Sequence, residues 1–266
     1  DVVISVPVLK THPRVNATIA LKNMFGTLPG TEKRAAHMLG INDSLIDLFS
    51  VLRPHYSIVD GSVAMEGTWR VPQDSRMLGL VLAGKDALAV DLVGCALMGI
   101  DPDSVLYLRH MTRWPGEVRS LRDVEVVGEA IETHAERFRT AFDVIKEGYP
   151  DVRFIEGPSF CGGCVAELVS ALRHVKGAGY GELMKGLTIV VGNPEEVEAS
   201  EKMVVIGGCS EALEEFGPLA VGCPPAEDAV IEAMCEAIGA DSSLVMSIRD
   251  DTRQQLWDDT RHFVME

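Results

Sequence analysis

The chain contains 266 residues, of which 47% are hydrophobic and 24% are charged, a composition that excludes an intrinsically disordered protein. Its formal net charge of −16 disfavours non-specific binding to nucleic acid or to anionic membranes, because the acidic surface repels phosphate groups. No apolar stretch is long enough to span a bilayer and no secretory leader precedes the first strand, so we expect a cytoplasmic protein without a membrane segment.

Short apolar segments alternate with helical patterns along the chain, which predicts an α/β fold with mostly parallel sheets. The first segment lacks an initiator Met, and the strand pattern is present from the first residue, so we expect that an upstream segment is missing. In the N-terminal half, strands are predicted at 1–8, 56–60, 77–83 and 124–127, and helices at 44–52 and 87–98.

Turn residues cluster at 149–151 and again at Gly157 and Pro158, which predicts a domain boundary there. We therefore expect an N-terminal α/β domain at 1–150 and a smaller, cysteine-rich α/β domain at 151–266. In the second domain, strands are predicted at 187–191, 203–206 and 219–221, and helices at 165–175, 226–238 and 250–266. Gly239 is the expected stop of the second of these helices, and Trp257 and Phe263 are expected to dock the acidic tail helix.

Four of the six cysteines follow a pattern that is typical of an inorganic centre. Cys161 and Cys164 form a Cys-Gly-Gly-Cys motif, Cys209 lies in Gly-Gly-Cys-Ser, and Cys223 lies in Gly-Cys-Pro-Pro. Thiolates are soft ligands that suit zinc or iron–sulfur clusters, and four of them complete the ligand set of either. Because each cysteine lies where a strand or loop meets a helix, we expect the four to converge at the carboxyl edge of a parallel sheet.

The cysteine pattern resembles the proximal-cluster motif of nickel–iron hydrogenase small subunits and of the related complex I subunit. In those families the four matching cysteines bind one four-iron four-sulfur cluster. The resemblance implies that Cys161, Cys164, Cys209 and Cys223 would be the ligands here. It is confined to this motif, so it implies a site and not a shared activity.

Three other interpretations of the four cysteines stay open, and the simplest of them, buried and unconnected cysteines, is disfavoured because all four lie in glycine-rich turns. A structural zinc site uses the same four thiolates, but such sites usually have two Cys-x-x-Cys knuckles and this chain has one, which favours the cluster. A redox-active dithiol of Cys161 and Cys164 would leave Cys209 and Cys223 without a role. The two remaining cysteines, Cys95 and Cys235, lie on apolar helical faces and are predicted to be core residues.

The N-terminal region, residues 1–128, resembles the domain of unknown function 362 family. The matching segments are 1–12, 20–26, 58–61, 65–67, 82–91 and 97–102. Members often carry iron–sulfur cysteines, so the resemblance implies a cofactor of the same kind as the cysteine pattern. The chain departs from the family pattern in two ways. The upstream sequence of the family is absent, and residues 68–72 replace the expected polar, glycine-rich stretch.

Polar residues gather at the predicted strand ends and turns of this region. They are Lys10, Thr11, His12, Lys22, Asn23, His37, Asp60, Glu66, Asp86 and Asp91. Lys10, His12, Lys22 and Asn23 are the candidate catalytic residues, because lysine and asparagine would bind a phosphate or carboxylate and His12 would transfer a proton. The structural alternative is that Asp60 and Asp86 cap turns or helices, that Asp91 is a partner on a helix face, and that the lysines are solvated.

Three functions follow from these patterns. The first is an iron–sulfur protein with one four-iron four-sulfur cluster that exchanges electrons with a redox partner protein. The second is a non-catalytic protein with a structural zinc site. The third is a metal-independent enzyme that acts on an anionic small molecule through Lys10, His12 and Lys22.

Overall fold

The computed structural model describes residues 1–68 and 71–260, without the side chains of residues 34, 37–39 and 256–260. The chain divides into two compact units. The N-terminal unit contains Asp1–Ile145 and Cys161–Gly163, and the C-terminal unit contains Lys146–Phe160 and the chain from Cys164 onward. The docking role predicted for Trp257 and Phe263 lies outside the described residues.

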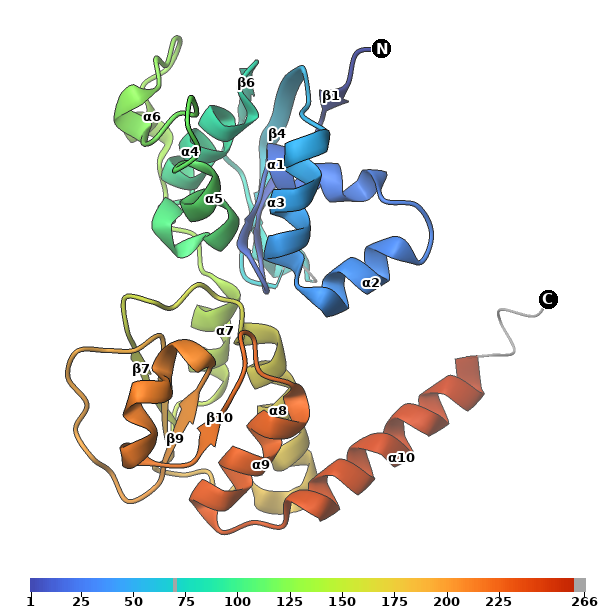
Figure 1. Ribbon diagram of the computed structural model, residues 1–266, viewed down its shortest axis with the longest axis vertical. Helices are drawn as coiled ribbons and strands as arrows, with labels where there is room; N and C mark the ends of the chain where they lie inside the picture. The colour runs from blue at the N-terminus through green and yellow to red at the C-terminus, as the bar shows by residue number, and fades with distance from the viewer. Residues whose placement is uncertain (69–70, 261–266) are drawn as a thin grey trace. The chain divides into compact units, whose positions relative to one another are not determined.

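The N-terminal unit contains a mixed six-stranded sheet (Figure 1). Its strands are β1 (Ile4–Ser5), β2 (Val8–His12), β3 (Asn16–Thr18), β4 (Tyr56–Met65), β5 (Ser75–Arg76) and β6 (Leu80–Gly84). The order is β1-β4-β2-β3, and β5 and β6 also pair with β4. Strands β1 and β2 are parallel to β4, whereas the other three pairings are antiparallel.

One face of this sheet is covered by helices and the other is open. Along β4, Ser57 and Val59 are buried while Ile58, Asp60 and Ser62 are exposed, the alternation of a half-buried strand. The helices are α1 (Ala20–Asn23), α2 (Glu32–Leu39), α3 (Ile41–Val51), α4 (Ala87–Leu97), α5 (Leu106–Met111), α6 (Ile131–His134) and α7 (Ala141–Gly148), which crosses the unit boundary. Short 3₁₀ turns lie at Met24–Thr27, Pro72–Asp74, Pro102–Ser104 and Leu121–Asp123.

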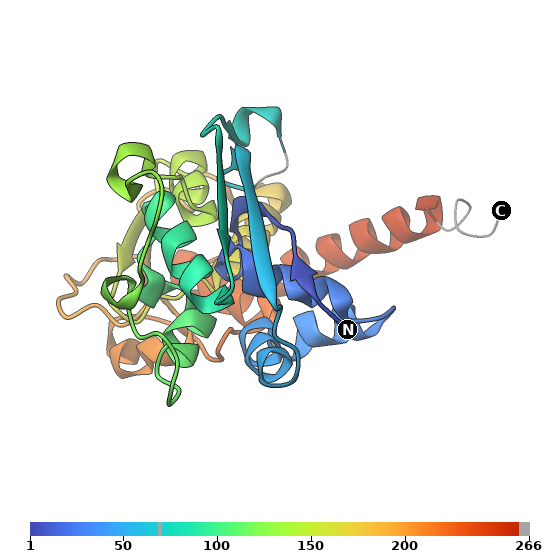
Figure 2. The same ribbon diagram turned by 90° about the horizontal axis from the view of Figure 1, so that it is seen from above.

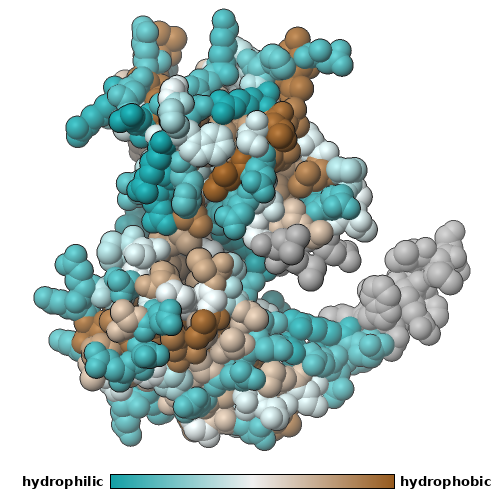
Figure 3. All heavy atoms as spheres, in the orientation of Figure 1, coloured by the Kyte–Doolittle hydropathy of each residue, from teal (hydrophilic) through white to brown (hydrophobic). Residues whose placement is uncertain are grey.

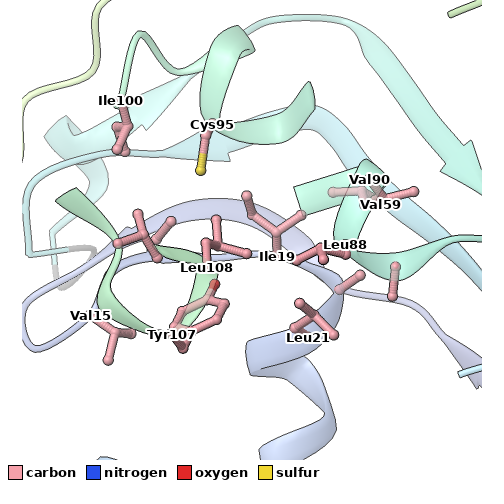
Figure 4. Close-up of a cluster of buried hydrophobic side chains, with 14 of the residues drawn as sticks. Val15, Ile19, Leu21, Val59, Leu88, Val90, Cys95, Ile100, Tyr107 and Leu108 are labelled. Carbon is pink, nitrogen blue, oxygen red and sulfur yellow. The ribbon is translucent and has the colours of Figure 1, made fainter. Parts of the chain in front are cut away.

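The core of the N-terminal unit lies between the covered sheet face and α3, α4 and α5. Ile19, Val59, Leu88 and Tyr107 are fully buried in it (Figure 4). Helix α4 is apolar on nearly all sides because it packs between the sheet and its neighbouring helices. This packing fixes β2 and α1, which carry the four candidate catalytic residues Lys10, His12, Lys22 and Asn23.

The C-terminal unit contains a four-stranded sheet in which every pairing is parallel. Its strands are β7 (Arg153–Glu156), β8 (Thr188–Val191), β9 (Met203–Ile206) and β10 (Leu219–Ala220), in the order β10-β9-β8-β7. Every residue of β8 and β9 is buried, as is usual for central strands of a parallel sheet with both faces covered.

The helices of this unit are α8 (Val165–Val175), which continues into a π-helical turn at Lys176–Tyr180, α9 (Glu227–Ile238) and α10 (Ser242–Thr260), with a 3₁₀ helix at Gly208–Phe216. Helix α10 packs on α8 and α9 at its start, and its second half extends away from them as a single helix (Figures 1 and 2). The part of the α10 surface that is coloured by hydropathy is mainly hydrophilic (Figure 3). No helix in the described part of the chain is both long and apolar enough to cross a bilayer.

The predicted α/β class with mostly parallel strands is confirmed, since five of the eight pairings among the described strands are parallel. Gly239 ends α9 in the left-handed conformation with φ of 70°, as predicted. The strand predicted at 124–127 is wrong, because this segment pairs with no other strand in the described structure and Val127 is 85% exposed. The strand predicted at 1–8 is two strands, separated at Val6 and Pro7, because proline has no N–H to donate.

Candidate functional site

The carboxyl edge of the C-terminal sheet is lined by glycine turns. Gly157, Gly192 and Gly207 directly follow β7, β8 and β9, and Gly222 comes two residues after β10. Because the four strands are parallel, all four turns emerge at the same edge, which is where open α/β sheets usually bind ligands. Cys209 and Cys223 lie in two of these turns, and Cys164 is the residue before α8.

Backbone hydrogen bonds join the turns that carry Cys209 and Cys223. The N–H of Gly207 donates to the carbonyl of Ala220 at 2.9 Å, and the N–H of Gly208 donates to the carbonyl of Gly222 at 2.7 Å. These bonds continue the β9–β10 pairing beyond the sheet and hold the two cysteine segments side by side. Both Cys209 and Cys223 are exposed.

Gly207 brings two of the candidate sulfurs to one place. A Cβ at this position would lie 3.2 Å from the Sγ of Cys164 and 3.6 Å from the Sγ of Cys209. The two sulfurs therefore face the same small volume, and the absence of a side chain at Gly207 keeps that volume open. The φ of 94° at Gly207 is a second reason for glycine, since residues with a side chain rarely adopt it.

Helix α8 begins immediately after Cys164, at Val165. The first N–H groups of a helix lack partners within the helix and give its N-terminus a positive potential. Such a position favours a thiolate over a thiol and favours a negatively charged group held by thiolates. Cys164 is 8% exposed, so this potential acts where solvent screening is weak.

Cys161 groups with the N-terminal unit, together with Gly162 and Gly163. It is half-buried, and its Sγ would lie 3.4 Å from a Cβ at Gly163. Gly162 lies against the side chain of Asn16, whose Oδ1 occupies the space that a Cβ would need. Within residues 1–68 and 71–260, no three His, Cys, Asp or Glu side chains are arranged to hold a single metal ion.

The other two cysteines are core residues, as predicted. Cys95 and Cys235 are both fully buried, the former in the cluster drawn in Figure 4. Burial raises the pKa of Cys95 well above its usual value and raises the pKa of Cys235 to about 11. Both side chains are therefore protonated thiols near neutral pH, a form that neither attacks as a nucleophile nor ligates metal.

Two of the candidate catalytic residues make local bonds. The Nδ1 of His12 accepts from the backbone N–H of Arg14 at 3.1 Å, which fixes the imidazole in the turn between β2 and β3. Asn23 is exposed at the end of α1, and its Nδ2 donates to the Oγ of Ser5 at 3.1 Å. These bonds account for both residues without a ligand.

Of the two candidate lysines, Lys22 is buried and Lys10 is half-buried. Lys22 is 8% exposed, and its Nζ lies 4.5 Å from the ring centroid of Phe25. Burial and the positive charges of Lys33 and Lys10 lower the pKa of Lys22 to about 8. Lys10, on β2, is half-buried. The side chain of His37, on α2, is outside the described part of the structure.

The acidic residues of the region stabilise the fold. Asp86 caps α4 by accepting from the N–H groups of Leu88 and Ala89, and Asp60 accepts from the N–H and hydroxyl of Ser62. Burial raises the pKa of Glu66, but its hydrogen bonds with Arg76 and Arg139 outweigh that effect and leave the pKa lowered.

Asp91 is a fully buried carboxylate that joins three elements. Its Oδ1 accepts from the N–H of Leu21 at 3.3 Å, and its Oδ2 accepts from the hydroxyl of Tyr107 at 3.1 Å. Burial raises the pKa of Asp91 to about 7, although hydrogen bonds from Leu21, Tyr107 and Ala20 act in the opposite direction. Asp91 therefore ties α1 and α5 to α4, the structural role expected for it from the sequence.

Comparison with known proteins bears on the N-terminal region. Residues 1–96 match the family described as "Domain of unknown function (DUF362)", which confirms the resemblance inferred for this region. The chain is also 35% identical over 111 residues to the "Thylakoid-associated protein sll1697" of Synechocystis sp. (strain ATCC 27184 / PCC 6803 / Kazusa). That match covers 40% of this chain and 35% of the relative's length, so the chain spans only about a third of that protein. No solved structure matches the chain.

Proposed function

We propose that the chain binds one four-iron four-sulfur cluster through Cys161, Cys164, Cys209 and Cys223 and serves in single-electron transfer. The observation that carries the proposal is the position of Gly207, where a Cβ would lie 3.2 Å from the sulfur of Cys164 and 3.6 Å from that of Cys209. Two thiols that are 45 residues apart in sequence thus face one volume at the ligand-binding edge of a parallel sheet.

The other two cysteines are tied to this place by the backbone. Cys223 directly follows Gly222, whose carbonyl accepts from the N–H of Gly208, the residue before Cys209. Cys161 precedes Cys164 by three residues, so it lies within about 11 Å of it along the chain. A ligand set of four cysteines is the one that these clusters use.

The surroundings of the sulfurs suit a cluster of negative charge. The N-terminus of α8 directs unpartnered N–H groups and positive potential toward the region of Cys164. Gly207 and Gly222 leave backbone without side chains in the turns that carry Cys209 and Cys223, so the backbone can lie close to an inorganic core. When bound, the cluster supplies one-electron transfer, and the protein sets its potential through ligation, burial and hydrogen bonds to the sulfurs.

The resemblance of the motif to the proximal-cluster motif of nickel–iron hydrogenase small subunits supports the same ligand assignment. A redox partner protein and a cytoplasmic location stay predictions. The alternative is a structural zinc ion on the same cysteines, which would draw all four sulfurs to about 2.3 Å from one point.

Metal and sulfide analysis of anaerobically purified protein tests the proposal. We expect iron and acid-labile sulfide in equal amounts, near four of each per chain, with the broad charge-transfer absorption of a cluster that bleaches on reduction. Stoichiometric zinc without sulfide would establish the structural alternative. Protein reconstituted with iron and sulfide that still binds neither would refute both the cluster and the electron-transfer role.

A further inference from the structure

Ser210 is a fully buried serine that directly follows Cys209 in the 3₁₀ helix after β9. It is the only buried residue of that helix, although its neighbour Cys209 is exposed. The position that points inward is therefore polar, whereas the apolar side chains of the helix keep some exposure. Because a hydroxyl group is costly to bury without hydrogen bonds, the contacts of Ser210 show what it holds in place.

The first contact of Ser210 joins two turns at the carboxyl edge of the sheet. Its Oγ accepts from the backbone N–H of Asn193 at 3.0 Å. Asn193 lies in the turn after β8 and has a φ of 53°, a conformation that is uncommon for residues with a side chain. The preceding residue, Gly192, accepts from the N–H of Ser159 at 2.8 Å, which extends the connection to the segment after β7. Ser210 thus anchors the turn that carries Cys209 to its neighbours along this edge.

The second contact of Ser210 is with the sulfur of Cys209. The Oγ of Ser210 and the Sγ of Cys209 lie 3.9 Å apart in a hydrogen bond. A hydroxyl has one hydrogen to donate and can accept as well, and the bond from Asn193 uses only its capacity to accept. A cysteine that ligates metal is a thiolate without a hydrogen, so with a ligating Cys209 the hydroxyl is the donor. Within residues 1–68 and 71–260, the side chain of Ser210 has no other hydrogen-bond partner.

We propose that Ser210 is a positioning residue that fixes Cys209 and raises the reduction potential of the centre bound there. The inference rests on the proposed function, because it concerns the potential of a cluster ligated by Cys209. Reduction adds one electron and makes the ligand sulfurs more negative, and a hydrogen bond to a charged acceptor is stronger than one to a neutral acceptor. Hydrogen bonds to the sulfurs are one of the factors that set cluster potentials, and this one stabilises the reduced state more than the oxidised state.

The test is an anaerobic potentiometric titration of the full chain loaded with iron and sulfide, with dithionite as the electron donor. Ser210→Ala removes the hydroxyl and should keep the iron content of the wild type. At a fixed potential its ratio of reduced to oxidised cluster should be about threefold lower, because one charge-assisted hydrogen bond is lost from the reduced state. For a one-electron couple this corresponds to a potential about 30 mV more negative.

Two further substitutions separate the hydrogen bond from a purely structural role. Ser210→Thr keeps a hydroxyl and should keep the wild-type potential, even where its added methyl group lowers stability. Ser210→Cys has a similar size and a weaker donor, so its potential should shift in the same direction by less. It replaces Ser210→Ala in the titration if the alanine variant loses iron.

Ser200→Ala is the matched control. It removes the same hydroxyl group from the same unit, where the Oγ of Ser200 bonds to Thr188 at the start of β8 and to the carbonyl of Lys202. Its potential should equal that of the wild type. Amide hydrogen exchange of Asn193 should be faster in Ser210→Ala than in Ser200→Ala, because only the former removes the acceptor of that N–H.

The outcomes distinguish this inference from the proposed function. An iron-loaded Ser210→Ala chain with the wild-type potential, or with a more positive one, would overturn the role of Ser210 and leave the cluster standing. Equal shifts in Ser210→Ala and Ser200→Ala would also overturn it, because the effect would then not depend on contact with Cys209. A wild-type chain that binds zinc alone, or neither iron nor sulfide, would refute both.

Discussion

The two sheets of this protein use their polar and reactive residues differently. In the C-terminal unit all strands are parallel, and Cys164, Cys209 and Cys223 lie on turns at one edge. In the N-terminal unit the sheet is mixed, and its acidic residues serve the fold: Asp86 caps a helix and Asp91 joins three elements. A parallel sheet collects the residues that follow its strands, whereas a mixed sheet distributes them to both ends.

The difference shows that sequence position near a strand end has a different meaning in the two units. A position just after a parallel strand predicts that the residue shares a site with residues after the neighbouring strands. Cys209 and Cys223 hold such positions after β9 and β10. In the mixed sheet the acidic candidates Asp60, Asp86 and Asp91 each meet a different partner: Ser62, the start of α4, and Leu21 with Tyr107.

The largest effect is expected for the cysteines of the parallel edge. Cys209→Ser should abolish nearly all iron and sulfide binding, because a serine hydroxyl is a poor substitute for a thiolate. Cys235→Ala in the same unit should keep the metal content of the wild type, because Cys235 is a buried core thiol. Iron analysis of the two variants side by side is the measurement, and equal iron loss in both would contradict the distinction between ligand and core cysteines.

The next effect concerns Asp91 and the dependence of stability on pH. Its pKa is about 7 in the folded protein and about 3.9 in an unfolded chain, so the folded state binds more protons between these values. The free energy of unfolding should therefore fall as pH rises from 4 to 7, by up to about 4 kcal/mol relative to Asp91→Asn. The stabilisation is complete below the unfolded pKa and is lost as pH passes the folded one.

Urea unfolding of the wild type and of Asp91→Asn at several pH values between 4 and 8 measures this difference. Asp103→Asn, which removes an exposed carboxylate from the same unit, should follow the wild-type curve. A wild-type curve parallel to that of Asp91→Asn across this range would show that Asp91 is ionised in both states.

The smallest effect in free energy is expected at Gly207. An added methyl group would crowd the sulfur of Cys164 at 3.2 Å and contact that of Cys209 at 3.6 Å, and the φ of 94° strains any residue other than glycine. Gly207→Ala should lower the free energy of unfolding by about 1–3 kcal/mol and reduce the iron content at the same time. Gly177→Ala is the control, because a Cβ there meets no atom within 4 Å and its φ is not positive.

The elements with strong periodicity were predictable from the sequence. Helices α4, α8 and α9 and strands β8 and β9 lie within about two residues of the predicted ranges, because continuous or periodic apolar patterns fix them locally. The segment 124–127 has the composition of a strand but no partner to pair with, and pairing is a property of the tertiary structure.

Some properties of the candidate site residues were likewise predictable from the sequence, and others needed the tertiary structure. The roles of Cys95 and Cys235 follow from their apolar helical faces, and the ligand chemistry of the other four cysteines follows from residue type and spacing. Ser210 has no role that the sequence predicts, because only its burial and its hydrogen bonds with Asn193 and Cys209 reveal one. His12 and Asn23 look like site residues until their partners, Arg14 and Ser5, are known.

The sequence by itself thus determined the α/β class, the main helices and strands, and the type of cofactor that the cysteines suit, because these depend on local periodicity and on side-chain chemistry. The tertiary structure decided which charged groups are buried and which atoms they meet. Burial sets the pKa of Lys22 and of Asp91, and it arises from segments distant in sequence that pack together. For the same reason the partners of His12 and Asn23, which are Arg14 and Ser5, could be known only from the tertiary structure.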